Sequence, residues 1–256
     1  MKIQSEGRLL RVTLDRVDKR NALNFETCEQ LVEVIEAAGN DVGTGAILLD
    51  GEGPVFCAGM DLEEAIREEA DERLRIHASL FTLGMRLKKP LIAAVHGACL
   101  GGGVGLAASA HVVVAAENCR FALTEIRLGL WPFAIWKAIE GAFGERRALE
   151  LSLTGRNFTA ADAERWGLVH LLTSEADLRE QSTQLAVQMA EASPVALENG
   201  LALVHGCREA NLEDALALAL RLRTGTLRSA DFHEGVTAWR EKRPPRWPSI
   251  SHDGPR

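Results

Sequence analysis

The sequence contains no tyrosine, few other aromatic residues and no excess of positive charge. Aromatic residues make up 5% of its 256 residues, and the formal net charge is −7. A nucleic-acid-binding domain typically carries clustered basic residues on one face, whereas no basic run occurs here before the C-terminus. The charge balance therefore argues against a nucleic-acid partner.

Long apolar runs and paired cysteines are also missing. No stretch reaches the roughly 18 apolar residues of a membrane-spanning helix, and the five cysteines have no Cys-x-x-Cys spacing. With no signal peptide, an odd number of unpaired cysteines indicates reduced thiols. We therefore expect a cytoplasmic protein without a membrane partner. Hydrophobic residues at 46% and charged residues at 25% are typical of a globular chain.

Two junctions in the sequence pass from a strand through glycine into a helix. The apolar run 91–95 leads through Gly97 into the glycines of 101–103, and the segment 55–58 leads into Gly59. Glycine permits a positive φ and close approach of a ligand to the backbone. A glycine turn that opens a helix directs free N–H groups outward, toward an anion or a developing negative charge. A tight turn with no ligand is the plain alternative.

The remaining pattern alternates strands and helices and then becomes purely helical. We expect strands at 9–14, 46–49, 91–95, 111–116, 120–123 and 168–172, and helices at 24–38, 62–87, 145–154 and 159–167. Asp61 and Glu64 have the spacing of a capping box for the second helix. Ser193, Asn211 and Asp231 are expected helix caps after residue 176. The sequence thus predicts an α/β domain over 1–194, a helical region over 195–256 and a poorly ordered end from Arg243.

Six fragments, in order along nearly the whole chain, resemble the enoyl-CoA hydratase/isomerase (crotonase) family. They are 16–23, 53–62, 96–103, 121–132, 153–169 and 239–243. The resemblance implies a crotonase-like spiral of ββα units with a C-terminal helical region that forms a homotrimer or a dimer of trimers. It implies an acyl-CoA thioester substrate, no metal, and no cofactor other than the coenzyme A of that substrate.

The resemblance also assigns the site. It implies that the backbone N–H groups of Met60 and Gly102 form an oxyanion hole and that Glu125 is the catalytic acid. Asp61, at the start of a helix, is expected to be structural. The implied substrate- and CoA-binding residues are Arg16, Lys19, Arg20, Ala22, Ala58, Gly59, Met60, Asp61, Leu62, Gly101, Gly102, Trp131, Phe133, Trp239 and Lys242. Of these, Trp131 and Phe133 either shape the acyl pocket or pack in the core, and Trp239 and Lys242 are expected to reach a neighbouring subunit's CoA.

One departure from the family pattern bears on the reaction. Hydratases of the family typically carry a second glutamate two residues after the glycine run, where this chain has Gly105. A single carboxylate suits a proton shuttle between two carbons better than the activation of water. We therefore expect an enoyl-CoA isomerase. A hydratase (lyase), another enolate reaction such as decarboxylation, and a non-catalytic acyl-CoA-binding scaffold remain alternatives.

Other chemistries fit poorly. The glycine run does not have the Gly-x-Gly-x-x-Gly spacing of a dinucleotide-binding turn, and no serine stands in a nucleophile elbow. His96 and His111 flank the glycine helix without a third ligand at matching spacing. Cys57 and Cys99 are expected to be small buried residues and not nucleophiles.

Overall fold

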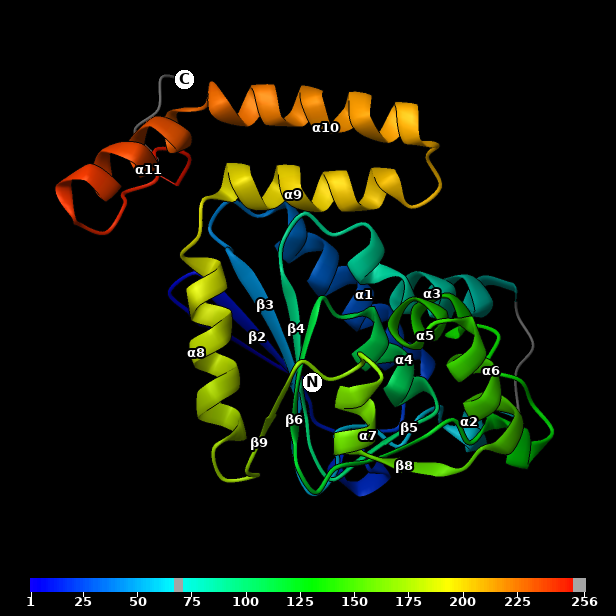
Figure 1. Ribbon diagram of the computed structural model, residues 1–256. Helices are drawn as coiled ribbons and strands as arrows, with labels where there is room; N and C mark the ends of the chain where they lie inside the picture. The colour runs from blue at the N-terminus through cyan, green and yellow to red at the C-terminus, as the bar shows by residue number, and fades with distance from the viewer. Residues whose placement is uncertain (67–70, 251–256) are drawn as a thin grey trace.

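A six-stranded sheet runs through the centre of the protein (Figure 1). The computed structural model describes residues 1–66 and 71–250. The strand order is β1-β2-β3-β4-β6-β9, with β1 antiparallel to β2 and the other pairs parallel. The strands are β1 (Lys2–Glu6), β2 (Leu9–Leu14), β3 (Ala46–Gly51), β4 (Leu91–Val95), β6 (Val112–Ala116) and β9 (Leu171–Thr173).

A second sheet of three strands holds the segments that matter for the site. It consists of β5 (Ala98–Leu100), β7 (Arg120–Ala122) and β8 (Asn157–Thr159). Strands β5 and β7 are parallel, and β7 and β8 are antiparallel. The Phe121 and Phe158 rings stack at 5.4 Å between centroids on the β7–β8 pair. Because β5 follows β4 directly in the chain, the second sheet lies against the end of the first.

The central strands of the large sheet are buried on both faces, whereas the residues of the edge strand β1 are exposed. In β3, Ile47 and Leu49 join the cluster that includes helices α1 (Phe25–Asn40) and α3 (Asp71–Phe81). Ala46 and Leu48 face helix α8 (Leu178–Ala190) on the other side. Alternating residues of one strand therefore enter two different cores, as the two-residue period of a strand requires. This arrangement confirms the expected α/β class.

The remaining helices surround the second sheet and form the C-terminal region. They are α2 (Leu62–Ala65), α4 (Gly102–Ser109), α5 (Trp136–Phe143), α6 (Glu145–Thr154), α7 (Ala160–Arg165), α9 (Pro194–Cys207), α10 (Leu212–Leu227) and α11 (Ala230–Glu241). Ser193 and Asn211 are the N-caps of α9 and α10, and each side chain accepts a hydrogen bond from the third residue of its helix. None of the described helices is long and apolar enough to cross a lipid bilayer.

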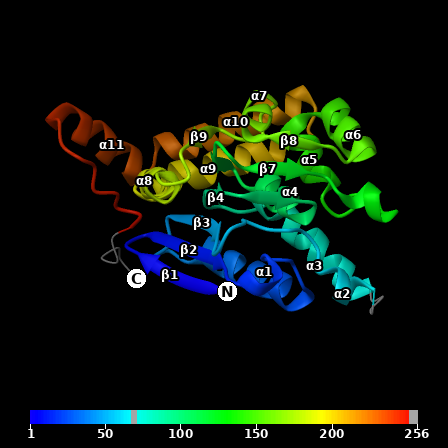
Figure 2. The same ribbon diagram turned by 90° about the horizontal axis from the view of Figure 1, so that it is seen from below.

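Helices α9 and α10 lie side by side above the sheet, and α11 extends away from them (Figures 1 and 2). In the described part of the chain, every regular element after β9 is a helix, as expected. Helix α8 belongs to the sheet domain, since its buried residues pack on β3, β4 and β6. The division at residue 194 and the role of the following helices in assembly remain predictions.

The expected cap at Asp231 is wrong. Ser229 is the N-cap of α11, and its side chain accepts from the N–H of Phe232. Asp231 is buried and accepts hydrogen bonds from Ser193 Oγ (2.6 Å) and Ser249 Oγ (2.7 Å). The carboxylate thus joins the start of α9 to the segment after α11, a contact between distant residues that no local pattern reveals.

The expectation of a poorly ordered end is wrong for residues 243–250. Arg243 forms a two-pronged pair with Glu234, with N–O distances of 2.6 and 3.1 Å. The indole N–H of Trp247 donates to the carbonyl of Glu191 at 2.7 Å. These bonds hold the segment against α11 and α8. Residues 251–256 lie outside the described part of the chain.

Candidate functional site

The two strand–glycine–helix junctions lie side by side because a short parallel ladder joins them. The N–H of Phe56 donates to His96 O (3.0 Å), the N–H of Cys57 to Ala98 O (3.2 Å), and the N–H of Leu100 to Cys57 O (3.0 Å). The chain direction is the same in both segments, so both glycine turns emerge at the same edge. The sequence predicted each turn, and only the structure pairs them.

The segment that carries Glu125 reaches the same edge through β7. Leu100 of β5 pairs with Ala122 of β7, and the N–H of Gly101 donates to Ala122 O at 2.8 Å. Glu125 opens a short 3-10 helix, Glu125–Leu128, three residues after β7. Parallel pairing therefore places the carboxylate next to the second glycine turn.

Two glycines are required where these segments meet. Gly59 has φ +94°, and a Cβ there would lie 2.8 Å from the carbonyl oxygen of Leu100. Gly101 has φ +50°, and a Cβ there would lie 3.1 Å from Glu125 Oε1. Residues with a side chain rarely adopt such a positive φ. Substitution of either glycine would therefore strain the backbone. The positive φ expected at these glycines is confirmed, and the approach of a ligand to them stays a prediction.

The N–H of Met60 faces away from its neighbouring segment. Leu23 and Met60 form an isolated parallel bridge. Its hydrogen bonds run from Leu23 N–H to Gly59 O (2.7 Å) and from Asp61 N–H to Leu23 O (2.9 Å). In such a bridge the residues flanking Met60 make the bonds. The Met60 N–H therefore points to the opposite side, toward the cavity that Met60 lines.

The N–H of Gly102 is the second donor at this place. Gly102 is the first residue of α4, so its N–H has no acceptor within the helix. The positive end of the helix dipole lies behind it. A Cβ at Gly59 would lie 3.4 Å from the Gly102 nitrogen, which shows how near the two junctions come. The segments that carry the two N–H groups therefore lie against each other beside the cavity that Met60 and Gly102 both line.

A cavity of about 230 Å³ opens beside these donors. It is lined by groups from all three segments and from α3 and the stretch before α5. The lining residues are Leu23, Ala58, Gly59, Met60, Leu62, His77, Phe81, Gly101, Gly102, Thr124, Glu125, Leu128, Leu130, Trp131, Pro132, Phe133, Ala134 and Ile135. Among these described residues, most are apolar, and Glu125 is the one carboxylate.

Glu125 is held in surroundings that favour its neutral form. Burial raises the pKa of its carboxyl above the ordinary value, against a smaller opposing effect of its own backbone N–H. Its Oε2 is buried and has no hydrogen-bond partner among the described residues. A carboxyl with a raised pKa and a free oxygen can both accept and return a proton.

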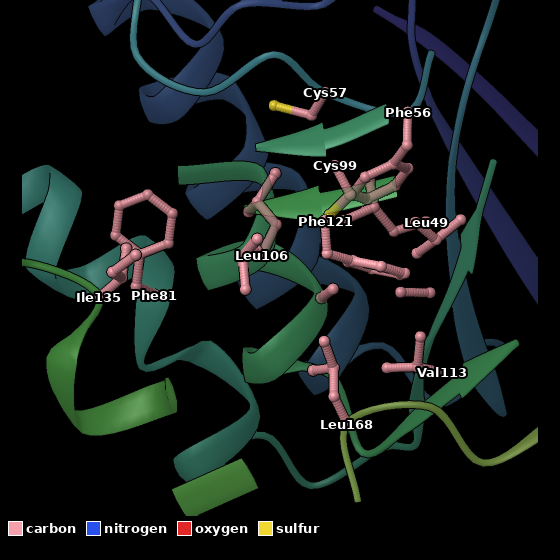
Figure 3. Packing of buried hydrophobic residues seen from close by; sticks show 14 of the residues in the cluster. Leu49, Phe56, Cys57, Phe81, Cys99, Leu106, Val113, Phe121, Ile135 and Leu168 are labelled. Carbon is pink, nitrogen blue, oxygen red and sulfur yellow. The ribbon is translucent and has the colours of Figure 1, made fainter. Parts of the chain in front are cut away.

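The position of the missing second glutamate is filled by apolar side chains. A Cβ at Gly105 would overlap Cγ2 of Ile135 and would lie 2.9 Å from Cδ1 of Phe81. Both residues are buried, both line the cavity, and Figure 3 shows them beside α4. The space beside Gly105 is therefore occupied by apolar side chains. Sequence reasoning identified Gly105 and expected the bulky segment 131–135 to shape the acyl pocket. It missed Phe81, and it did not place Ile135 against Gly105, because these residues lie 24 and 30 positions away along the chain.

The loop expected to contact CoA, residues 16–22, is joined by an ion pair to the first glycine junction, residues 55–62. Arg16 donates to the carbonyl of Ala22 and pairs with Asp61 at 3.0 Å. Burial works to raise the pKa of Asp61, but the hydrogen bond and charge of Arg16 outweigh it and lower the pKa below its ordinary value. Asp61 stands at the N-cap position of α2, but its side chain makes no capping bond. Its structural role therefore lies in the pair with Arg16.

The capping box at the second helix is absent, and the helix is shorter than expected. The Glu64 carboxylate accepts from the N–H of Phe25 at 2.7 Å instead of returning to Asp61. In place of one helix over 62–87, the described residues form α2, α3 and a 3-10 turn at Leu83–Met85. Residues 67–70 of that expectation lie outside the described part of the chain.

Two further cations of the predicted CoA loop lie at the surface beside α2. Lys19 pairs with Glu63 at 2.9 Å, and both side chains are exposed. The backbone carbonyl of Arg20 accepts a hydrogen bond from the N–H of Ala58 at 3.0 Å. The side chain of Arg20 is exposed to solvent. The structure thus brings the loop 16–22 together with residues 58–62.

The predicted aromatic residues fall into two groups. Trp131 and Phe133 line the cavity, and the Trp131 ring packs against Trp136 at 5.9 Å between centroids. Helix α11, which carries Trp239 and is followed directly by Lys242, lies at the opposite end of the molecule from α2 in both views (Figures 1 and 2). Within one chain, Trp239 and Lys242 are therefore not part of this site. Trp239 instead lines a separate cavity of about 280 Å³ beside α11.

His96 and His111, which flank the glycine helix α4, contact backbone groups. Nδ1 of His111 accepts from the N–H of Leu91 at 2.9 Å, and its Nε2 lies 2.8 Å from Gly84 O. Burial lowers the pKa of His111 to about 4. Nε2 of His96 lies 2.8 Å from Gly53 O. Both residues hold chain segments in place next to the junctions.

A comparison with sequence models of protein families identifies the family of this chain. The model described as enoyl-CoA hydratase/isomerase matches residues 4–250. The chain belongs to this family. The enoyl-CoA hydratase/isomerase match covers both glycine junctions, the Glu125 segment and the C-terminal helices, so the chain is an enzyme of this family with an acyl-CoA substrate.

Solved structures show that the enzyme has the crotonase fold. An enoyl-CoA hydratase from Bacillus anthracis superimposes with a TM-score of 0.91 at 26% identity and covers 97% of this chain and 98% of its own. An enoyl-CoA hydratase from Polaromonas sp. JS666 has a TM-score of 0.87 at 31% identity, with 96% and 98% covered. The predicted spiral fold with a helical C-terminal region is confirmed.

Curated relatives of this enoyl-CoA hydratase/isomerase carry hydratase and dehydratase names. A 2,3-dehydroadipyl-CoA hydratase of Escherichia coli (strain K12) is 36% identical over 245 residues, which are 95% of this chain and 96% of the relative. A carnitinyl-CoA dehydratase of Proteus mirabilis (strain HI4320) is 32% identical, with 96% and 97% covered. These names differ in the acyl group, so they do not define the substrate of this enzyme.

Proposed function

We propose that this enzyme moves a double bond in an enoyl-CoA thioester with Glu125 as its single acid and base. The thioester oxygen would accept hydrogen bonds from the N–H groups of Met60 and Gly102. The Glu125 carboxylate would remove a proton from C2 of a 3-enoyl-CoA, and the electrons of that C–H bond would move onto the thioester to give a dienolate. The protonated Glu125 would return the same proton to C4, leaving the double bond between C2 and C3.

The occupation of the Gly105 position by Ile135 and Phe81 carries this proposal. Hydration by this family's pattern needs a second carboxylate that helps to hold and deprotonate a water molecule, and among the described lining residues Glu125 is the one carboxylate. Transfer of one proton between two carbons needs only the oxyanion donors and one carboxyl whose pKa is close to the working pH. The raised pKa of Glu125 supports that role.

Hydration is the second candidate, because the names of the relatives favour it. The experiment incubates the purified enzyme separately with trans-3-hexenoyl-CoA and with crotonyl-CoA. Formation of trans-2-hexenoyl-CoA is followed by its ultraviolet absorption and by chromatography. We expect isomerisation at a rate at least about 100-fold above hydration, the low end of what a positioned general acid–base contributes. Hydration at an equal or higher rate would show that the reaction is that of a hydratase.

Substitution of Gly102 tests the second oxyanion donor. Proline is accommodated at the first position of a helix, so Gly102→Pro removes the N–H where the helix itself does not use it. We expect kcat for isomerisation to fall by about 10²–10³-fold, as is typical for the loss of one such donor. Steady-state kinetics of Gly102→Pro and of the control variant measure the change in kcat.

Gly102→Ala is the matched control. It retains the N–H and adds the same Cβ, which would meet only side-chain ends of Leu23 and Phe81 at 3.3 and 3.4 Å. If the two variants lose activity equally, crowding and not the lost donor is responsible, and the assignment of Gly102 is wrong.

Several further assignments remain proposals of the same kind. CoA binding by Arg16, Lys19, Arg20 and Ala22 is supported by their attachment to residues 58–62. The distance of α11 from the cavity supports the prediction that Trp239 and Lys242 reach the CoA of a neighbouring subunit in a homotrimer or a dimer of trimers. We likewise propose a cytoplasmic location.

A further inference from the structure

The acyl side of the cavity is closed at one end and open at the other. At the closed end, Ile135 and Phe81 fill the space beside Gly105. At the open end, apolar side chains that line the cavity are also exposed to solvent: Leu62 at 44%, Leu128 at 56%, Leu130 at 40% and Phe133 at 74%. We call these four residues the apolar rim. Large exposed apolar side chains that gather at the mouth of a cavity mark a surface for an apolar ligand.

Charge is nearly absent from the same lining. Among the described lining residues, Glu125 alone carries a carboxylate, and no lysine or arginine is present. Of the nearby cations, Arg16 pairs with Asp61 and Lys19 with Glu63, and the exposed Arg20 does not line the cavity. A negative charge on the acyl group would therefore lose water without meeting a lysine or arginine in the described lining, in which His77 is the one histidine, and it would be repelled by an ionised Glu125.

We infer that the substrate of this enzyme is the CoA thioester of an uncharged hydrocarbon acyl group whose far end passes out over the apolar rim. Acyl groups that end in a carboxylate are rejected by the rim and by Glu125. Phe133, the most exposed of the four, is a specificity-determining residue. The inference rests on the proposed function only in taking this cavity as the acyl site.

The test is an equilibrium one and needs no turnover. Isothermal titration calorimetry measures binding of three probes to the wild-type enzyme: CoA, hexanoyl-CoA and adipoyl-CoA, the last two matched in carbon number. We expect hexanoyl-CoA to bind at least about ten-fold more tightly than adipoyl-CoA, because an unpartnered charge loses its hydration in the cavity. Equal dissociation constants for the two thioesters, or hexanoyl-CoA binding no tighter than CoA, would overturn the inference.

A charge introduced at the rim provides the matched experiment. Phe133→Arg should narrow the preference for hexanoyl-CoA over adipoyl-CoA by about five-fold, the upper range for an exposed ion pair. Leu153→Arg is the control, because Leu153 is also an exposed apolar residue, at 58% on α6, but does not line the cavity. An unchanged ratio in Phe133→Arg, or the same change in both variants, contradicts a role of the rim.

The two proposals fail in different ways. If the enzyme prefers hexanoyl-CoA in the binding experiment but does not convert trans-3-hexenoyl-CoA, the substrate class holds and the isomerase proposal is wrong. If it converts trans-3-hexenoyl-CoA but binds adipoyl-CoA equally well, the isomerase proposal holds and the substrate class is wrong.

Discussion

We expect Glu125→Gln to lower kcat for isomerisation by about 10²–10⁴-fold, the range attributed to a positioned general acid–base. Glutamine has the shape of glutamate but cannot take up or release the proton, so the loss reports proton transfer and not packing. Binding of hexanoyl-CoA is expected to stay within about two-fold of wild type, because Glu125 faces the reacting carbons and not a charged part of the ligand. Stopped-flow kinetics and calorimetry measure the two quantities.

Stability provides the control for folding in this variant. Burial raises the pKa of Glu125, so above its ordinary pKa the ionised side chain destabilises the folded state relative to the unfolded one. Removal of the charge at neutral pH should therefore leave the melting temperature equal to or above that of wild type. Glu117→Gln, an exposed carboxylate before β7, should change neither activity nor stability. Retention of wild-type kcat in Glu125→Gln would remove Glu125 from the mechanism.

The raised pKa of Glu125 also predicts how kcat/KM depends on pH. The reaction begins with Glu125 ionised, so kcat/KM should fall as the pH drops through the raised pKa. This acidic limb should lie at higher pH than an ordinary glutamate would give, because desolvation disfavours the charged form. The residual activity of Glu125→Gln should lack the limb.

The second large effect is expected at Gly105. Gly105→Ala adds a Cβ that overlaps Ile135 and approaches Phe81. Overpacking typically costs about 1–3 kcal/mol, which outweighs the roughly 0.5–1 kcal/mol that alanine gains over glycine in a helix. We therefore expect a net loss of stability in chemical denaturation. Gly200→Ala is the matched control: nothing lies within 4 Å of its added Cβ in α9, so the same exchange should stabilise.

Removal of Ile135 should relieve that clash. Ile135→Ala alone is expected to cost about 2–5 kcal/mol through the cavity it leaves. In the double variant the new methyl group occupies part of that cavity, so the combined loss should be smaller than the sum by about 0.5–3 kcal/mol. Strict additivity would mean that the two positions do not compete for the same space.

The functional counterpart is Gly105→Glu combined with Ile135→Ala. This pair places a second carboxylate on the cavity wall and makes room for water beside Glu125. We expect hydration of crotonyl-CoA to become measurable while isomerisation falls, since the apolar packing beside residue 105 is lost. Ile135→Ala alone admits water without a carboxylate and is the control. Hydration that appears equally in both would assign the effect to water entry alone.

Local patterns in the sequence were sufficient for much of the fold. Continuous apolar runs at 46–49 and 91–95 predicted buried strands, and the glycines at 59 and 101–103 predicted two tight turns before helices. Ser193 and Asn211 were identified as caps because a cap depends only on residues within one turn. The resemblance then assigned Met60, Gly102 and Glu125 to one site, although they lie far apart in the chain.

What the sequence alone determined is the α/β class, the family and the chemical groups available to the site. The tertiary structure decided which of those groups meet. It placed Asp61 against Arg16 instead of in a capping box, held residues 243–250 against α11 and α8, and put Ile135 and Phe81 into the space above Gly105. Each of these is a contact between residues distant in the chain, where packing and charge pairing override local propensity. The absence of a second glutamate was therefore readable in the sequence, but the apolar wall that replaces it was not.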